Sequence, residues 1–219
     1  MPALPDGEPV PPDGALPPAS SARVGQAPFG VYVHVPFCAT RCGYCDFNTY
    51  TARELAADGV VVSPTSYVDV VLGELRLARD VLTAGGASPP PAARTVFVGG
   101  GTPSLLDPAD LARLLAGIRD ELGLAPDAEV TTEANPESVD QARLAALREA
   151  GFTRLSLGMQ SDREHVLATL ERAHRPGRAA ACVDWAHRAG FEHVSVDLIY
   201  GTPGESDADW RASLQAAVD

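Results

Sequence analysis

Residues 31–47 read Val-Tyr-Val-His-Val-Pro-Phe-Cys-Ala-Thr-Arg-Cys-Gly-Tyr-Cys-Asp-Phe, a β-branched run followed directly by three closely spaced cysteines. The run predicts a buried strand over Val31–Val35, because its apolar and β-branched residues are nearly continuous. Cys38, Cys42 and Cys45 follow with the spacing C-x3-C-x2-C, on the loop that leaves the carboxyl end of this strand. Ligands and catalytic groups gather at that end in parallel α/β folds, so this loop is the first candidate site.

Four further runs of the same kind predict strands, at Thr95–Val98, Glu129–Thr132, Arg154–Leu157 and His193–Ile199. Helical patterns lie between them. The one over Tyr67–Leu82 predicts a single apolar stripe made of Val70, Val71, Leu75, Ala78 and Leu82. Repeated β-then-α order predicts an α/β fold, a partial parallel (β/α) barrel with at least five βα units. The last helix, starting near Ser206, still runs at Asp219, so a further strand is expected beyond it.

The ends of the helices carry readable signals. Ser138–Gln141 and Ser161–Glu164 have the spacing of capping boxes, which predicts that a helix begins at each. Gly151 and Gly190 are expected to end helices, since glycine adopts the left-handed conformation found there.

The chain divides into two parts by composition. Residues 1–28 are rich in Pro, Ala, Gly and Ser without apolar periodicity, which predicts a disordered leader. The folded domain is expected over 29–219, as an incomplete barrel that lacks a C-terminal domain. Ala52–Pro64 and Thr83–Ala93 look like insertions and are expected to be mobile surface loops.

Composition excludes several classes of function. The net charge of −12 over 219 residues disfavours binding to nucleic acid or to an anionic membrane, since both depend on Lys and Arg. No apolar run approaches the ~20 residues of a membrane span, and the N-terminus does not look like a secretory signal. The chain is therefore expected to be cytoplasmic, in a reducing compartment.

Clustered cysteines in such a compartment indicate metal chemistry. Three thiolates on a tight loop can hold three corners of a [4Fe–4S] cluster and leave the fourth iron open to another ligand. Structural zinc is the alternative, with Asp46 and His34 near in sequence. Zinc requires four closed ligands, and a second C-x2-C pair is absent from the sequence. The remote Cys182 is expected to be a small buried apolar residue.

The segment Tyr32–Phe47 resembles the cluster loop of the radical S-adenosylmethionine (SAM) superfamily. It is most similar to the branch that holds oxygen-independent coproporphyrinogen III oxidases and their heme-chaperone relatives, and the resemblance extends over about residues 29–219. It implies a [4Fe–4S] cluster on Cys38, Cys42 and Cys45, whose open iron binds the amino and carboxylate groups of SAM. One electron from the cluster would then cleave SAM to a 5′-deoxyadenosyl radical.

The resemblance also implies which residues contact SAM. In the glycine run after the second strand, Gly100, Gly101 and Thr102 would contact the amino group, and the absence of Cβ atoms lets a ligand approach the backbone. The other implied contacts are Glu133, Gln160 and Asp197 for the ribose, adenine and methionine portions, Arg172 for the carboxylate, and Tyr32 and Tyr44 near the site.

Each of these residues also has a purely structural interpretation. The glycines fit a plain turn, and Tyr32 fits a core strand. Arg172 fits a solvated helix, and any of the strand-end polar residues fits a capping or paired buried group. An aspartate within an apolar strand, such as Asp197, is costly unless it is paired or liganded.

One position separates the subgroups of the branch. Coproporphyrinogen oxidases carry a further cysteine two residues after the third ligand, where this chain has Phe47. This difference favours the heme-chaperone subgroup, whose members bind heme and pass it to hemoproteins. The alternatives are a coproporphyrinogen III oxidase and another radical SAM enzyme, for example one acting on RNA. Implied partners are heme or a porphyrin, a hemoprotein acceptor and an electron donor such as flavodoxin or ferredoxin.

Overall fold

The computed structural model describes residues 11–57, 64–84 and 89–219. Five strands form one sheet in the order of the chain, namely β1 (Gly30–Val35), β4 (Ala93–Gly100), β5 (Leu124–Ala134), β6 (Arg154–Gln160) and β7 (His193–Leu198). All four neighbouring pairs are parallel, as crossover connections require. The predicted α/β fold is confirmed as a partial (β/α) barrel, and each predicted strand lies where the sequence places it.

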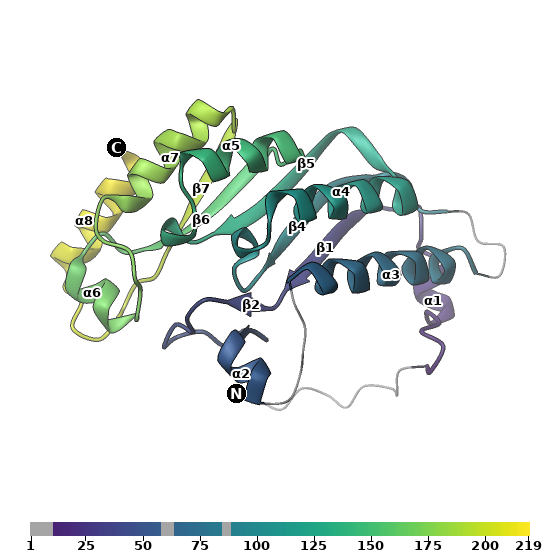
Figure 1. The fold of residues 1–219 in the computed structure, drawn as a ribbon, viewed down its shortest axis with the longest axis horizontal. Coiled ribbons are helices and arrows are strands. Elements are labelled where there is room, and N and C mark those ends of the chain that lie inside the picture. Colours follow the sequence, from purple (N-terminus) through teal and green to yellow (C-terminus); the bar gives the residue numbers. More distant parts are fainter. Residues whose placement is uncertain (1–10, 58–63, 85–88) are drawn as a thin grey trace.

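The crossover helices cover one face of this sheet (Figure 1). They are α3 (Pro64–Leu82), α4 (Pro108–Leu122), α5 (Gln141–Ala150) and α7 (Arg178–Ala189), and each packs against the next. At the far end lie α6 (Glu164–Thr169) and α8 (Asp207–Val218). The shorter elements are α1 (Pro18–Ser21), β2 (Phe37–Cys38), β3 (Tyr50–Thr51), α2 (Ala52–Ala57), η2 (Pro103–Leu105) and η3 (Pro136–Ser138). No helix within the described residues has the length and hydropathy that a bilayer crossing requires.

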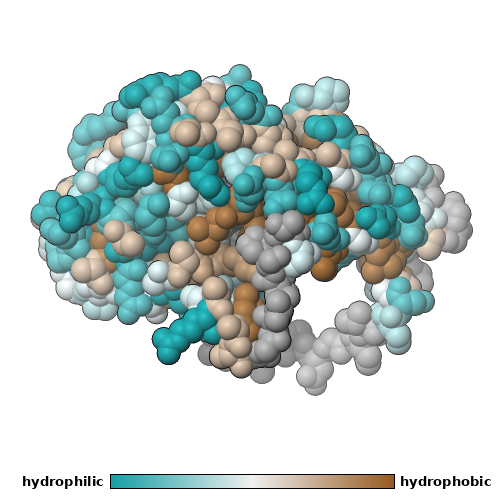
Figure 2. Space-filling view, viewed as in Figure 1, coloured by the Kyte–Doolittle hydropathy of each residue, from teal (hydrophilic) through white to brown (hydrophobic). Residues whose placement is uncertain are grey.

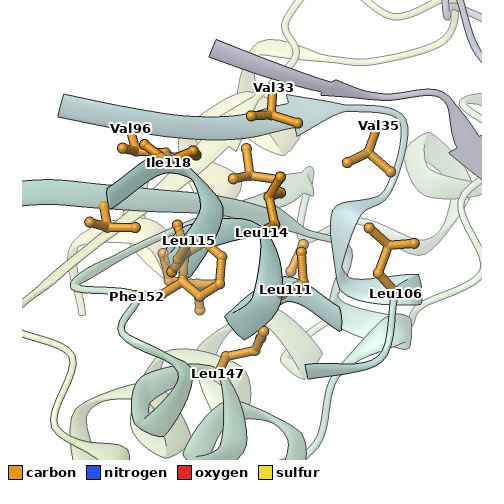
Figure 3. Packing of buried hydrophobic residues seen from close by; sticks show 14 of the residues in the cluster. Val33, Val35, Val96, Leu106, Leu111, Leu114, Leu115, Ile118, Leu147 and Phe152 are labelled. Atoms are coloured by element: carbon orange, nitrogen blue, oxygen red, sulfur yellow. The ribbon is translucent and has the colours of Figure 1, made fainter. Parts of the chain in front are cut away.

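The hydrophobic core lies between the sheet and these helices. Leu111, Leu114 and Ile118 of α4 are fully buried and point at the strands that carry Val33 and Val96 (Figure 3). The solvent side of the helices is mostly hydrophilic, with hydrophobic residues gathered toward the lower edge of that face (Figure 2). The helices therefore bury one apolar stripe each and leave the other face of the sheet free for polar groups.

That other face carries residues which alternate with the core valines and leucines. Arg154 donates to Thr131 Oγ1 (3.4 Å) and to Ser195 Oγ (3.0 Å), and so joins three strands. Ser195 in turn donates to Ser156 Oγ (3.1 Å). A chain of hydrogen bonds thus crosses the inner face of the barrel below the carboxyl ends of the strands.

The predicted stripe of α3 is wrong at one position. Val70 is 66% exposed, whereas Val68 is fully buried beside Val71 and Leu75. The spacing 68, 71, 75 follows the helical repeat, and Val70 falls one residue outside it.

Two predicted capping boxes are also wrong. The α5 helix begins after Asp140, whose side chain accepts from the Arg143 N–H, while Ser138 instead closes the short η3 turn with Asn135. At α6, the N-cap residue Arg163 makes no side-chain cap hydrogen bond. The predicted ends at Gly151 and Gly190 are confirmed, with φ of +113° and +95°.

Part of the first predicted loop is helical. Residues Ala52–Ala57 form α2, because Thr51 Oγ1 accepts from the Glu54 N–H and the Glu54 carboxylate accepts from the Thr51 N–H. Such reciprocal capping satisfies the exposed amides of a helix start. Residues 58–63 and 85–88 of the two predicted loops lie outside the described residues.

The leader also falls partly outside the described residues, which begin at residue 11. Within its described part the chain forms the single turn α1. The boundary between a leader and a domain at residue 28 stays a prediction.

We expect Leu114→Ala to lower the free energy of unfolding by about 3 kcal/mol, since it removes a fully buried side chain and leaves a cavity. Leu77→Ala is the matched control, because Leu77 is 55% exposed. Urea unfolding followed by circular dichroism measures both. Equal losses in the two variants would contradict this placement of the core.

Candidate functional site

The carboxyl ends of the strands surround a pocket that contains about 660 Å³ of empty space, part of it open to solvent. Its lining comes from the cysteine loop and from all the strands β4 to β7 or the turns that follow them. All the predicted site residues except Tyr32 line it, namely Cys38, Cys42, Tyr44, Cys45, Gly100, Gly101, Thr102, Glu133, Gln160, Arg172 and Asp197.

The cysteine loop is closed at its base by a two-residue ladder. Phe37 and Cys38 in β2 pair in parallel with β3, and the Tyr50 N–H donates to the Pro36 carbonyl (2.7 Å). Within the loop, the Cys45 N–H donates to the Cys42 carbonyl (3.0 Å), which forms a turn between two of the thiols. The loop is thereby held over the end of β1 with its cysteines toward the pocket.

The three cysteines line one pocket. Among the described residues, no three Cys, His, Asp or Glu side chains converge closely enough to hold one metal ion. A single zinc ion requires such convergence at about 2.0–2.3 Å. In a cubane cluster each thiolate binds a different iron, so the three sulfurs stand apart. His34 is engaged elsewhere, with Tyr32 Oη (2.8 Å) and the Asn48 carbonyl (2.8 Å).

The glycine turn packs against this loop. A Cβ at Gly101 would lie 2.5 Å from the Phe37 carbonyl oxygen and 3.0 Å from Cys38 Sγ. Gly100 has φ of +113°, and a Cβ there would lie 2.7 Å from the His34 ring. The space beside both glycines is therefore taken by the chain itself, which is a stricter reason for glycine than the approach of a ligand.

Next to the turn lie two carboxyl groups on the inner face. Glu133 accepts a hydrogen bond from the Gly100 N–H (2.8 Å). Burial, together with the nearby Asp197 charge, raises the pKa of Glu133, although the Gly100 N–H and His34 act in the opposite direction. Burial likewise raises the pKa of Asp197, against the hydrogen bond from Ser156 and the charge of Arg154. Two carboxyls of raised pKa that line one cavity are typical of a functional site.

The backbone is strained at two points around the pocket. The pairing of β6 with β7 shifts register between Leu157 and Gln160, and Gln160 has φ of +63°. Glu171, directly before Arg172, has φ of +56°. Left-handed non-glycine residues and strand bulges cluster at functional sites, where they aim side chains that regular strands would point elsewhere.

Arg172 is the most deeply buried charge at the pocket, with 3% of its side chain exposed. Its Nη1 donates to Cys42 Sγ (3.3 Å), and its Nη2 donates to Asn135 Oδ1 (2.6 Å) and to the Gly158 carbonyl (3.1 Å). Its Nε is buried and has no hydrogen-bond partner. The solvated-helix alternative is therefore wrong. A buried guanidinium that lines a pocket suits a carboxylate ligand.

Tyr32 is the predicted residue that the structure does not bring into the pocket. Its side chain is 59% exposed, its hydroxyl contacts His34, and its ring packs on Phe97. Tyr44 does line the pocket, and burial raises the pKa of its phenol to about 12.

Asn135 is a pocket residue that sequence reasoning missed. Its Nδ2 donates to Thr102 Oγ1 (3.0 Å) while its Oδ1 accepts from Arg172 (2.6 Å). Asn135 follows the third strand directly and precedes Pro136, and this position at a strand end could have indicated a pocket residue. Ser156 and Gly158 also line the pocket.

Comparisons with known proteins agree with this geometry. A sequence model of the radical SAM superfamily matches residues 32–217. The heme chaperone HemW of Mycobacterium tuberculosis (strain CDC 1551 / Oshkosh) is 58% identical over 191 residues, which are 87% of this chain and 46% of that protein. HemW of Escherichia coli (strain K12) is 37% identical over 193 residues, 88% of this chain and 48% of that protein. The chain spans about half the length of these curated relatives.

A solved structure with the same arrangement is coproporphyrinogen III oxidase (HemN) from Escherichia coli, described as a radical SAM enzyme. It superposes with a TM-score of 0.74 at 28% identity, and the match covers 90% of this chain and 43% of that one. The five-stranded partial barrel and its strand order therefore have an experimental counterpart.

We expect Glu133→Gln to raise the free energy of unfolding of the cofactor-free protein at pH 7 by about 1 kcal/mol, the scale of a single stabilising substitution. A carboxyl whose pKa is raised in the folded state binds its proton more tightly there than when unfolded. Its ionisation therefore costs stability as pH rises from its ordinary pKa through the raised one.

Urea unfolding at pH 4 and pH 7 checks this expectation, with the exposed Glu149→Gln as control. The free energy of unfolding of Glu133→Gln should exceed that of the wild type at pH 7, and the difference should shrink toward pH 4. A variant that is less stable than wild type at pH 7 would contradict it.

Proposed function

This chain belongs to the radical SAM superfamily, and from that premise we propose that Cys38, Cys42 and Cys45 hold a [4Fe–4S] cluster and that the adjoining pocket binds SAM. One observation carries the proposal, namely that three thiols, two carboxyls and the guanidinium of Arg172 line a single cavity. Three protein thiolates leave one iron of a cubane open, which suits a small chelating ligand.

Each pocket residue then has a role. Gly100, Gly101 and Thr102 would contact the amino group of SAM, and Arg172 would bind its carboxylate as a charge-assisted pair. Glu133, Gln160 and Asp197 would receive the ribose, adenine and methionine portions, with Tyr44 beside the adenine. The bound cluster would supply the single electron for reductive cleavage of SAM. Gln160 and Arg172 are aimed by the two strained backbone positions described above.

For the whole protein we propose a heme chaperone, which binds heme and transfers it to hemoproteins. The support is the 58% identity to a protein named as heme chaperone HemW, together with Phe47 at the position where oxidases carry cysteine. Phe47 lines the pocket and is 62% exposed. The proposal includes a cytoplasmic location and an electron donor of the flavodoxin or ferredoxin type.

The second candidate is an oxygen-independent coproporphyrinogen III oxidase, which the structural likeness to HemN favours. Both candidates need the same cluster and the same SAM pocket. They differ in whether a porphyrinogen is turned over.

We expect anaerobically reconstituted protein to hold about four iron and four sulfide per chain. Cys42→Ser should remove most of this content, because it deletes one of three ligands. Cys182→Ala should retain it, since Cys182 is buried in α7 beneath the Pro136 carbonyl. Iron and sulfide analysis with the visible spectrum measures the outcome. Stoichiometric zinc in anaerobically purified protein would contradict the cluster.

We expect the protein to bind heme and to form no protoporphyrinogen when it is incubated anaerobically with SAM, a reductant and coproporphyrinogen III. Heme titration followed by absorbance measures the first part, and chromatography of porphyrins and of 5′-deoxyadenosine measures the second. Sustained formation of protoporphyrinogen would favour the oxidase instead.

A further inference from the structure

A cluster of ionisable side chains made of Arg172, Glu137 and His174 adjoins the pocket. One carboxylate oxygen of Glu137, Oε2, lies 3.6 Å from Arg172 Nη2 and 3.4 Å from His174 Nδ1. The side chains of Arg172 and His174 are 3% and 1% exposed, and that of Glu137 is 33% exposed. Glu137 is thus the bridging anion between two buried nitrogen side chains.

The cluster joins the ends of neighbouring strands. Glu137 belongs to η3, the turn that follows β5, while His174 Nε2 donates to the Met159 carbonyl (3.0 Å) in the irregular end of β6. Arg172 and His174 lie on one short segment after α6, directly behind the left-handed Glu171. A fixed carboxylate here ties the Arg172 segment to both strand ends.

Glu137 does not face the pocket. It lines a separate cavity on the other side, with Val139, Arg143 and Arg178. Burial raises the pKa of Glu137, but the close contact with His174 and the charge of Arg172 outweigh burial and bring it below its ordinary value. The ionised carboxylate therefore balances the charge of Arg172 at Nη2, while Nη1 points to Cys42 in the pocket.

The distribution of contacts on Arg172 supports this division. Its Nη2 is committed to Asn135, Gly158 and Glu137, which all belong to the chain. Its Nη1 reaches Cys42 Sγ, and its Nε has no partner. A planar guanidinium held through Nη2 has a fixed orientation, and such pre-organisation raises the affinity of a site for a carboxylate.

We propose that Glu137 and His174 are positioning residues, which fix the guanidinium of Arg172 beside Cys42 so that the pocket takes the carboxylate end of its ligand. The inference rests on the proposed SAM site and adds two residues that act on SAM only through Arg172. Their effect is confined to the carboxylate, because neither side chain reaches the rest of the pocket.

The test compares two ligands that differ only at that end. SAM carries the carboxylate, whereas decarboxylated SAM keeps the sulfonium, the amino group and the adenosine. Equilibrium dialysis of each with the full chain carrying its reconstituted cluster gives the two dissociation constants. We expect Glu137→Gln to weaken SAM roughly 10- to 100-fold, as removal of outer-shell partners does at metal sites. Binding of decarboxylated SAM should be unchanged.

Three further variants complete the design. His174→Gln should show the same selective loss, and Glu137→Asp, which keeps the charge, should restore part of the affinity. Glu149→Gln removes an exposed carboxylate elsewhere and should change neither ligand. Iron content and the melting temperature, measured for each protein, report whether the cluster and fold are intact.

The outcomes separate this inference from the proposed function. A wild-type protein that binds neither ligand would overturn both. A wild type that binds SAM while Glu137→Gln binds it equally well would overturn the positioning role alone. Equal weakening of the binding of both ligands would assign Glu137 and His174 to the scaffold and overturn the positioning role too. So would loss of the iron–sulfur cluster or of the fold in all of Glu137→Gln, Glu137→Asp and His174→Gln.

Discussion

The close approach of the glycine turn to the cysteine loop is the constraint on which the site depends. Only a residue without Cβ fits at Gly101, because an added Cβ would lie 2.5 Å from the Phe37 carbonyl oxygen. The same packing brings Thr102 Oγ1 to 3.9 Å from Cys38 Sγ. The end of β4 and the first thiol are thereby fixed relative to each other. The remaining pocket residues follow from parallel pairing, because each strand ends at the same rim.

The pocket holds charges that the fold alone would avoid. Glu133 and Asp197 sit where burial opposes their ionisation, and Arg172 keeps an unpaired N–H out of solvent. Each is unfavourable for the cofactor-free protein and becomes favourable only when a ligand of complementary charge is present. The same side chains therefore limit stability and create affinity. The apolar layer beneath α4 offsets this cost at a distance from the pocket.

The strands, the pocket residues and the short helices were predictable from the sequence to different degrees. The strands were predictable, because their apolar and β-branched residues form nearly continuous short runs. The pocket residues were largely predictable too, since each follows a strand in the sequence. The helix Ala52–Ala57 was not, although Thr51 and Glu54 have the capping spacing, because its residues carry no apolar stripe. Tyr32 was expected at the site only because its motif resembles that of the family. The alternation of side chains along a strand does not give the distance of a side chain from a cavity.

The contact between Arg172 and Cys42 spans 130 positions of the chain. During synthesis at 5–20 residues per second, the thiol therefore leaves the ribosome roughly 10 s before the guanidinium that covers it. Because each strand pairs with the next one in the chain, β1 and β4 can assemble early with the cysteine loop already in place. For that interval the Cys42 thiol is without its guanidinium partner, and an oxidant or a metal ion can react with it first.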